Sequence, residues 1–200
     1  LVFQLKLLNI QKIDGNLYID NTLFDGISRG PGWMWDEGAD RWASPMDALT
    51  LNHSCVDLWI KPAEKYGEAP EVYLQPKTTF VHVENQALTS AEQNDLTVER
   101  RWMDHDNIID IKGSIAASNE TLHYSVAIEH PHLYAAHVFR DILLKARLVF
   151  KGKILVKRTP DNAVLIASHF SRPLSAIVEE MMKSSDNLIS DCLFKKMGEK

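Results

Sequence analysis

Two polar side chains near the end of the sequence could act together on a ligand. Ser185 and Asn187 are two residues apart in the stretch MMKSSDNLISDCLF, residues 181–194. Serine, aspartate and asparagine are poor helix-interior residues but good N-caps, so the stretch can simply mark a boundary between two helices. A turn at a helix start can also direct a hydroxyl and a carboxamide into one cleft. The S-x-N spacing alone leaves both interpretations open.

A long loop, residues 25–47, holds a second group of residues that could bind a ligand. It carries three tryptophans and three nearby acidic residues: Trp33, Trp35, Trp42, Asp36, Glu37 and Asp40. Loops of this length are usually functional or disordered, and tryptophans argue against disorder. The indoles can simply anchor the loop to its own domain, with the carboxylates solvated. Alternatively, a carboxylate attracts an ammonium group while an indole packs against the aliphatic part of the same ligand.

Strands dominate the middle of the predicted fold. A helix at 1–8 and a strand at 16–20 come first, and turn signals then separate further strands at 56–60, 72–74, 79–83, 96–101, 108–111 and 121–128. A helix at 132–145 follows, and then strands at 153–158 and 163–168. The sequence therefore predicts an α+β protein with a β-rich unit in its middle.

Two helices are predicted on either side of the S-x-N stretch. Apolar residues of the first recur with the spacing of one helix face: Leu174, Ile177, Val178, Met181 and Met182. Ser171 is the expected N-cap, with Pro173 near the first turn. The periodicity stops at Lys183 and resumes at Leu188, so we expect the second helix to begin at about Asn187.

Composition excludes several classes of function. The 200 residues are 45% hydrophobic and 24% charged, with a net charge of −5, and no basic stripe suggests a nucleic-acid partner. No apolar run of about 18 residues predicts a transmembrane segment. The two cysteines form no CxxC, and the eight histidines form no H-E-x-x-H, so neither a metal nor another cofactor is expected.

Residues 169–198, HFSRPLSAIVEEMMKSSDNLISDCLFKKMG, resemble one segment of a known family. This family is the class C low-molecular-mass penicillin-binding proteins (peptidase S13 type), which are serine D-Ala-D-Ala carboxypeptidases and endopeptidases. Its pattern is S-x-P-L, a helix, K-x-S-D-N-x-x-x-(E/D) and a helix ending at glycine. The matching residues here are Ser171, Pro173, Leu174, Lys183, Ser185, Asp186, Asn187, Asp191 and Gly198.

Further pieces of the chain are similar to the same family in the same order. They are IDNTLFDG (19–26), PGWMW (31–35), WASP (42–45), ALTLN (48–52), IDIKGSI (109–115) and HPHLYAA (130–136). The resemblance therefore covers nearly the whole chain.

The resemblance implies acyl transfer by a serine nucleophile and a lysine base, with elements S-x-x-K, S-x-N and K-T-G. Ser185 would relay a proton between that lysine and the leaving amine, and Asn187 would hydrogen-bond the substrate amide. No S-x-x-K or K-T-G occurs in this sequence; Lys77-Thr78-Thr79 is the nearest string. We therefore expect an internal fragment that neither hydrolyses peptides nor binds penicillin covalently by itself.

For the tryptophan loop, the resemblance implies recognition of the peptidoglycan stem peptide. In the family an acidic residue lies five positions before the aromatic residue of the S/A-P turn, and it approaches the side chain of the third stem-peptide residue. The corresponding positions here are Glu37 and Trp42. Diaminopimelate at that third position would offer an ammonium group to Glu37 and an aliphatic chain to Trp42.

The expected architecture is therefore part of a penicillin-binding, serine β-lactamase/transpeptidase-like α/β domain with nested insertions. By resemblance, residues 1–60 and 121–160 form an α/β insertion, 61–120 a β-rich domain, and 161–200 part of the penicillin-binding domain. The expected function is a periplasmic or otherwise extracytoplasmic D-Ala-D-Ala carboxypeptidase/endopeptidase, with stem peptides and, in the complete enzyme, β-lactams as ligands. The alternative is a non-catalytic stem-peptide binder or scaffold with the same insertions.

Overall fold

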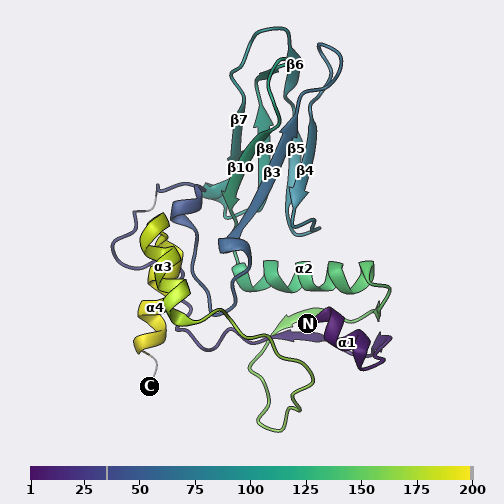
Figure 1. Cartoon of the computed structure of the whole chain (residues 1–200), viewed down its shortest axis with the longest axis vertical. Coiled ribbons are helices and arrows are strands. Elements are labelled where there is room, and N and C mark those ends of the chain that lie inside the picture. The colour runs from purple at the N-terminus through teal and green to yellow at the C-terminus, as the bar shows by residue number, and fades with distance from the viewer. Residues whose placement is uncertain (35, 199–200) are drawn as a thin grey trace. The chain divides into compact units, whose positions relative to one another are not determined.

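The computed structural model describes residues 1–34 and 36–198. These residues form two compact units of mixed helices and small sheets (Figure 1). Unit 1 consists of Leu1–Gly32, Pro45–Leu51 and His130–Lys200, and unit 2 consists of Trp33–Ser44 and Asn52–Glu129. The three-part division given above for the larger protein stays a prediction.

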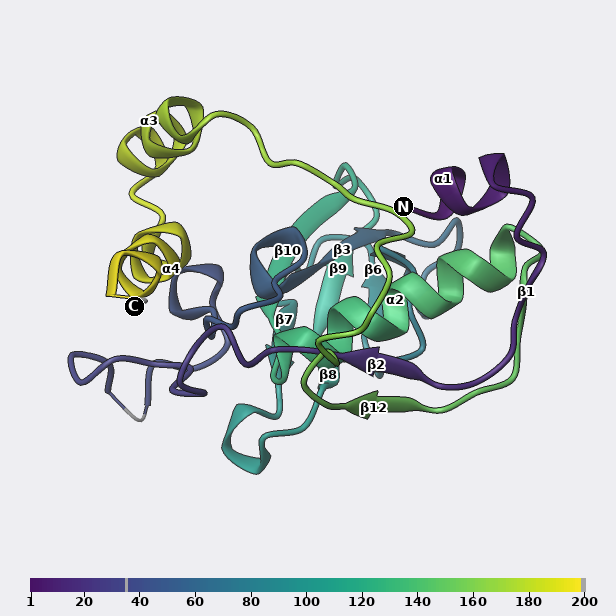
Figure 2. The same ribbon diagram turned by 90° about the horizontal axis from the view of Figure 1, so that it is seen from below.

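Unit 1 is built around one long helix, α2 (Pro131–Lys145), which lies against short parallel strand pairs. Its other elements before α3 are α1 (Val2–Leu7), β1 (Lys12–Ile13), β2 (Leu17–Ile19), β11 (Val149–Phe150) and β12 (Ile154–Val156). Strand β1 pairs with β11, and β2 pairs with β12, next to α2 (Figure 2). Leu143, Leu148 and Phe150 are buried in this core.

A close backbone approach joins the two strand segments of unit 1. A Cβ atom at Gly152 would lie 1.8 Å from the carbonyl oxygen of Gly15, so no larger residue fits at position 152 without moving the chain. The side chain of Asn16 accepts a hydrogen bond from the Lys153 backbone N–H at 2.9 Å beside this contact. A residue without a side chain therefore allows segments 137 positions apart to meet.

The last two helices of unit 1 are α3 (Leu174–Ser184) and α4 (Asn187–Gly198), coloured yellow-green and yellow in Figure 1. The prediction of two helices with a boundary at SSDN, the second beginning at about Asn187, is confirmed. The expected N-cap was wrong, because the N-cap position of α3 is occupied by Pro173, and Ser171 lies outside the helix. A proline disfavours helical geometry in the residue before it, so Arg172 does not begin the helix and Ser171 is not its N-cap.

Unit 2 contains three small sheets. The first has the order β10 (Leu122–Ala127), β3 (Cys55–Lys61) and β4 (Glu71–Gln75), all antiparallel. The second has the order β5 (His82–Asn85), β8 (Ile108–Lys112) and β7 (Thr97–Arg100), in which β5 and β8 are parallel. The third pairs β6 (Leu88–Ser90) with β9 (Ser114–Ala116), and short 3₁₀ turns occur at Arg41–Ala43, Asn52–Ser54 and Trp102–Asp104.

The core of unit 2 follows from the period-2 alternation of its strands. Val56, Leu58 and Ile60 point inward from β3, and Ile109 and Ile111 point inward from β8, and all five are fully buried. Polar and aromatic side chains occupy the outward positions of β3, which alternate with the buried ones. Alternation of this kind makes the predicted β-rich region recognisable from sequence.

One charged pair is buried within this apolar core. The Arg100 guanidinium donates to the backbone oxygen of Ala127 at 2.7 Å, to that of Asp106 at 2.9 Å and to the Glu129 carboxylate at 3.1 Å. The Arg100 side chain is fully buried, and a buried charge is tolerated only when it is paired and hydrogen-bonded. The pair connects β7 to the residues that follow β10.

Two strand predictions were wrong. Residues 163–168 form no strand, although Val164, Leu165 and Ile166 make an apolar run; Val164 is 83% exposed. Strand β5 begins at His82, so Thr79, Phe80 and Val81 lie before it. An apolar, β-branched run favours a strand only when a neighbouring strand is present to pair with it.

Candidate active site

The S-x-N pair lies at the junction of α3 and α4. Ser185 is the C-cap of α3 and has left-handed backbone angles, φ 52° and ψ 45°. The backbone N–H groups of Ser185 and Asp186 both donate to the carbonyl oxygen of Met181, which closes α3. Asn187 is then the first residue of α4. Left-handed geometry is uncommon in residues other than glycine, and such geometry clusters at functional sites.

Asp186, between the two candidate residues, supplies the N-cap of α4. Its carboxylate oxygen Oδ1 accepts a hydrogen bond from the Ile189 N–H at 2.9 Å, and its backbone oxygen accepts one from the Ser190 N–H at 3.2 Å. The capping interpretation of SSDN is therefore correct, and Asp186 is the residue that caps. Because Asp186 satisfies the helix start, Ser185 and Asn187 do not have to serve as caps.

The two neighbouring serines have different surroundings. The Ser184 hydroxyl donates back to the carbonyl oxygen of Glu180 at 2.8 Å, as serine often does inside a helix. The Ser185 side chain is exposed, and it makes no hydrogen bond to any residue in the part of the chain that the structure describes. Ser185, and not Ser184, therefore has a hydroxyl available for a ligand.

Contacts within unit 1 hold α4 in place. Leu188 is buried, and the Lys195 ammonium pairs with the Asp25 carboxylate and donates to the Ile27 carbonyl oxygen at 2.8 Å. The lysine also lies 6.0 Å from the centroid of the Phe24 ring. The hydrogen bond from Lys195 holds the pKa of Asp25 below its usual range. No local sequence signal predicts this contact, because Lys195 and Asp25 are 170 residues apart.

A second contact reaches α4 from residues 45–51. The His132 side chain of α2 lies 2.5 Å from the Asp47 carboxylate, measured from Nδ1 to Oδ2. The backbone of Asp47 hydrogen-bonds the sulfur of Cys192 on α4. Burial raises the pKa of Cys192 to about 11, so its thiol is protonated at neutral pH and is a poor nucleophile. The His-Pro-His start of α2 is the only sequence signal for this link, and it predicted a helix start alone.

Residues 33–44 of the tryptophan loop belong to unit 2, and the structure brings aromatic and acidic residues of this part together. The Trp33 and Trp42 rings are stacked, with centroids 6.0 Å apart and an interplanar angle of 28°. Trp42 is 48% exposed, and its indole N–H donates to Asp40 at 3.2 Å. The Glu37 carboxylate accepts the Met34 N–H at 3.3 Å. Trp35 lies outside the described residues.

This loop is fixed to strand β10. The Ala127 N–H donates to the carbonyl oxygen of Ala39 at 2.8 Å, and Asp40 forms an isolated bridge with Val126. The loop thus presents a half-buried carboxylate and a half-exposed indole from a fixed backbone. Both interpretations of the tryptophans are compatible with this geometry, since the stacked pair supports the loop and leaves part of Trp42 accessible.

The other groups that could form a site are the cysteines and the possible metal ligands. Cys55 and Cys192 form no disulfide, and burial raises the pKa of the Cys55 thiol as well. Within residues 1–34 and 36–198, no group of three or more His, Cys, Asp or Glu side chains could hold a metal ion. No helix in the same described ranges is long and apolar enough to cross a membrane.

Comparison with known proteins defines the class to which this fold and site belong. The model of the D-Ala-D-Ala carboxypeptidase 3 (S13) family matches residues 1–200, so the chain belongs to this family. Among curated proteins, it is 29% identical over 199 residues to the D-alanyl-D-alanine carboxypeptidase DacB of Haemophilus influenzae. It is 26% identical over 201 residues to a D-alanyl-D-alanine carboxypeptidase of Actinomadura sp. (strain R39).

These matches cover almost all of this chain but less than half of each relative. The aligned part is 99% of the chain and 41% of the Haemophilus protein, and 95% of the chain and 37% of the Actinomadura protein. The crystal structure of penicillin binding protein 4 (dacB) from Haemophilus influenzae matches with a TM-score of 0.75 and 28% identity, covering 98% of this chain and 43% of that one. The mixed α/β fold predicted from the sequence, that of a penicillin-binding protein, is confirmed.

A second solved structure supports the same fold. It is the same Haemophilus protein complexed with a novel β-lactam, and it matches with a TM-score of 0.60 and 23% identity over 96% of this chain and 40% of that one.

Proposed function

We propose that this chain is part of an extracytoplasmic serine-type D-Ala-D-Ala carboxypeptidase/endopeptidase that acts on peptidoglycan stem peptides. The observation that carries the proposal is the conformation of Ser185, a left-handed residue with an exposed hydroxyl between two capped helices. Family membership and the names of the two carboxypeptidase relatives support the same chemistry. β-Lactams are the expected inhibitors, since the related Haemophilus protein was crystallised with one.

The proposed reaction is acyl transfer. The serine of an S-x-x-K element attacks the carbonyl carbon of the penultimate D-Ala, the lysine takes the serine proton, and the bond to the terminal D-Ala nitrogen breaks. The leaving amine gains a proton and departs, and water then hydrolyses the acyl-enzyme. This chain contains neither S-x-x-K nor K-T-G, so its role is to supply the S-x-N element.

Each S-x-N residue has a separate task in this proposal. The Ser185 hydroxyl both donates and accepts hydrogen bonds, so it can pass a proton from the lysine to the leaving amine. The Asn187 carboxamide can donate to the substrate carbonyl and orient the lysine through its other polar atom. Their fixed position at a helix boundary supports catalysis, since precise placement of groups lowers the barrier.

The tryptophan loop is the proposed recognition element for the stem peptide. Glu37 would attract the ammonium group of a diaminopimelate side chain, while Trp42 packs against its aliphatic part. The half-buried Glu37 carboxylate and the partly exposed Trp42 indole support this assignment.

A labelled-penicillin gel tests the proposed function. The full-length gene product containing this chain is expected to form a covalent band that survives denaturation, and the 200-residue chain alone is expected to form none. A full-length protein with S-x-x-K upstream and K-T-G downstream that stays unlabelled would count against the enzyme and favour the stem-peptide scaffold. A band on the 200-residue chain would contradict the assignment of S-x-N as one partial element.

A further inference from the structure

A row of aromatic side chains crosses the outward face of the β10-β3-β4 sheet in unit 2. Trp59 on β3 is directly opposite Tyr73 on β4 and His123 on β10 in the strand register. Trp59 is 40% exposed and Tyr73 is 55% exposed, whereas their neighbours Leu58 and Ile60 are fully buried. Neither the S-x-N junction nor the tryptophan loop uses this row.

The indole of Trp59 is held in place on one side. His123 stacks on it with ring centroids 4.3 Å apart and an interplanar angle of 26°. The His123 Nε2 atom lies 3.1 Å from Oδ1 of Asp57, and Asn52 donates to the other oxygen of Asp57 at 2.9 Å. A chain of hydrogen bonds thus fixes the histidine that supports the tryptophan.

The indole of Trp59 stays partly accessible, with 40% of the residue exposed. The Tyr73 hydroxyl donates to Glu71 two residues away at 2.5 Å, which directs the tyrosine along its own strand. Among the described residues, no ring other than that of His123 stacks on Trp59. Two partly exposed aromatic rings therefore lie at paired positions of neighbouring strands.

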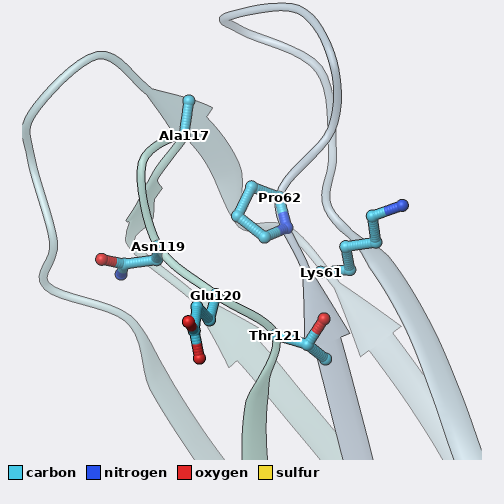
Figure 3. Close-up of a pocket in the computed structure, with 6 residues that line it drawn as sticks. All are labelled: Lys61, Pro62, Ala117, Asn119, Glu120 and Thr121. Atoms are coloured by element: carbon cyan, nitrogen blue, oxygen red, sulfur yellow. The ribbon is translucent and has the colours of Figure 1, made fainter.

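Polar groups and a hollow adjoin the aromatic row. The hollow has a volume of about 360 Å³ and is lined by Lys61, Pro62, Ala117, Asn119, Glu120 and Thr121 (Figure 3). Lys61 is the residue of β3 two positions beyond Trp59 and continues its outward face, and Thr121 directly precedes β10. Lys61 makes no ion pair with any residue in the described part of the chain. The volume is within the usual range for small-ligand sites, about 300–1,000 Å³.

We infer that this face binds an extended, β-linked pyranose chain. A pyranose ring has a flat C–H face that packs on an aromatic ring and hydroxyl groups around its edge that need donors and acceptors. Trp59 and Tyr73 supply the aromatic surface, and the hollow beside them supplies hydrogen-bonding groups. Neighbouring strands are about 4.8 Å apart, so a row across three strands spans about 10 Å and suits a stretched sugar chain.

The alternative is that Trp59 and His123 only stabilise the sheet, as cross-strand aromatic pairs do. That role accounts for the stacked pair, but it does not require the exposure of Trp59 or of Tyr73. The inference goes beyond the proposed function, whose chemistry is confined to the stem peptide. It proposes that unit 2 binds the sugar chain to which such peptides are attached.

Calorimetric titration of the full-length protein with N-acetylchitohexaose tests the inference, with cellohexaose and maltoheptaose as further arms. Both β-linked sugars are expected to bind, and a preference for the first or second separates an N-acetylated from a plain glycan. Maltoheptaose, which is α-linked and curved, is expected not to bind. Absence of β-linked binding, or equal binding of maltoheptaose, would overturn the inference.

Variants locate the site. Trp59→Ala and Tyr73→Ala are each expected to weaken N-acetylchitohexaose binding roughly tenfold, the usual scale of one aromatic contact. Trp59→Phe should retain most of the affinity. Tyr18→Ala is the matched control, because Tyr18 is 50% exposed on strand β2 of unit 1 and should bind like the wild type. Unchanged affinity in Trp59→Ala, or an equal loss in Tyr18→Ala, would refute the location.

The same variants separate the two proposals. Penicillin labelling should be unaffected by Trp59→Ala and Tyr73→Ala, which also shows that these proteins fold. Loss of sugar binding with labelling intact supports the glycan site. Sugar binding that is absent in a wild-type protein that labels normally refutes the glycan site alone.

Discussion

Different interactions stabilise the strands of unit 2 and the helices α3 and α4 of unit 1. In unit 2, Val56, Leu58 and Ile60 are fully buried. The ion pair between Arg100 and Glu129 is buried as well. In α3 no residue is buried, and Met182 is 70% exposed although it lies on the apolar face. Long-range packing therefore determines unit 2, whereas caps and local hydrogen bonds determine the S-x-N junction.

The largest expected effect comes from the junction itself. Ser185→Ala in the full-length protein should lower kcat/KM for a D-Ala-D-Ala peptide by roughly 10²–10⁴, the range for losing a group that transfers protons. Ser184→Ala is the control, since its hydroxyl is already bonded to Glu180. Steady-state kinetics on both variants decide the matter. Equal losses in the two would contradict the assignment of Ser185.

A core truncation tests the difference in packing. Leu58→Ala should lower the free energy of unfolding of unit 2 by about 2–5 kcal/mol, because it leaves a cavity among fully buried neighbours. Met182→Ala on exposed α3 should change stability by less than about 0.5 kcal/mol. Urea denaturation followed by far-UV circular dichroism, which reports the strands and the helices together, measures both. A large loss for Met182→Ala would show that α3 is packed as tightly as unit 2.

Removing the cap of α4 should have a smaller effect. Asp186→Ala removes the acceptor for the Ile189 N–H and should destabilise α4 by about 1 kcal/mol. Hydrogen exchange of the first turn of α4 is the measurement, with the exposed residue Asp161 changed to Ala as control. Unchanged exchange in Asp186→Ala would mean that tertiary contacts, and not the cap, fix the junction.

The smallest effect is a pH dependence at the anchor of α4. Lys195 holds the pKa of Asp25 below its ordinary value of 3.8, so the folded state prefers the ionised carboxylate. The contribution is therefore present above pH 3.8 and is lost as the pH falls through the lower, folded-state value. A carboxyl NMR titration should give a depressed pKa that rises in Lys195→Ala. A pKa that is the same in both proteins would rule out the anchor.

The sequence predicted elements whose signals are local. The break in apolar periodicity at Lys183 located the α3–α4 boundary, and the alternation in Val56–Ile60 located β3. The local signal misled where partners were missing, as in the apolar run around Val164 that pairs with no strand among the described residues. It also misplaced the cap at Ser171, since Pro173 excludes a helical residue before it.

Contacts between residues far apart in the chain could not be predicted from the sequence. These contacts are the pairs of Arg100 with Glu129, His132 with Asp47, and Lys195 with Asp25. All six are ordinary polar residues whose partners are fixed only by the fold. The parallel pairing of β5 with β8 likewise follows from topology, because the intervening β7 joins the other side of β8. Family motifs identified Ser185 and Asn187, and the apolar periodicity predicted the helix start at Asn187, whereas the left-handed conformation of Ser185 required the structure.

The most direct test of the account is a crystal structure of the full-length protein with a bound peptide boronic acid that mimics the tetrahedral intermediate. The Ser185 hydroxyl and the Asn187 carboxamide are each expected to lie within about 3.2 Å of the inhibitor or of the catalytic lysine, as hydrogen-bonded groups do. An inhibitor bound covalently while both side chains contact only solvent would contradict this expectation.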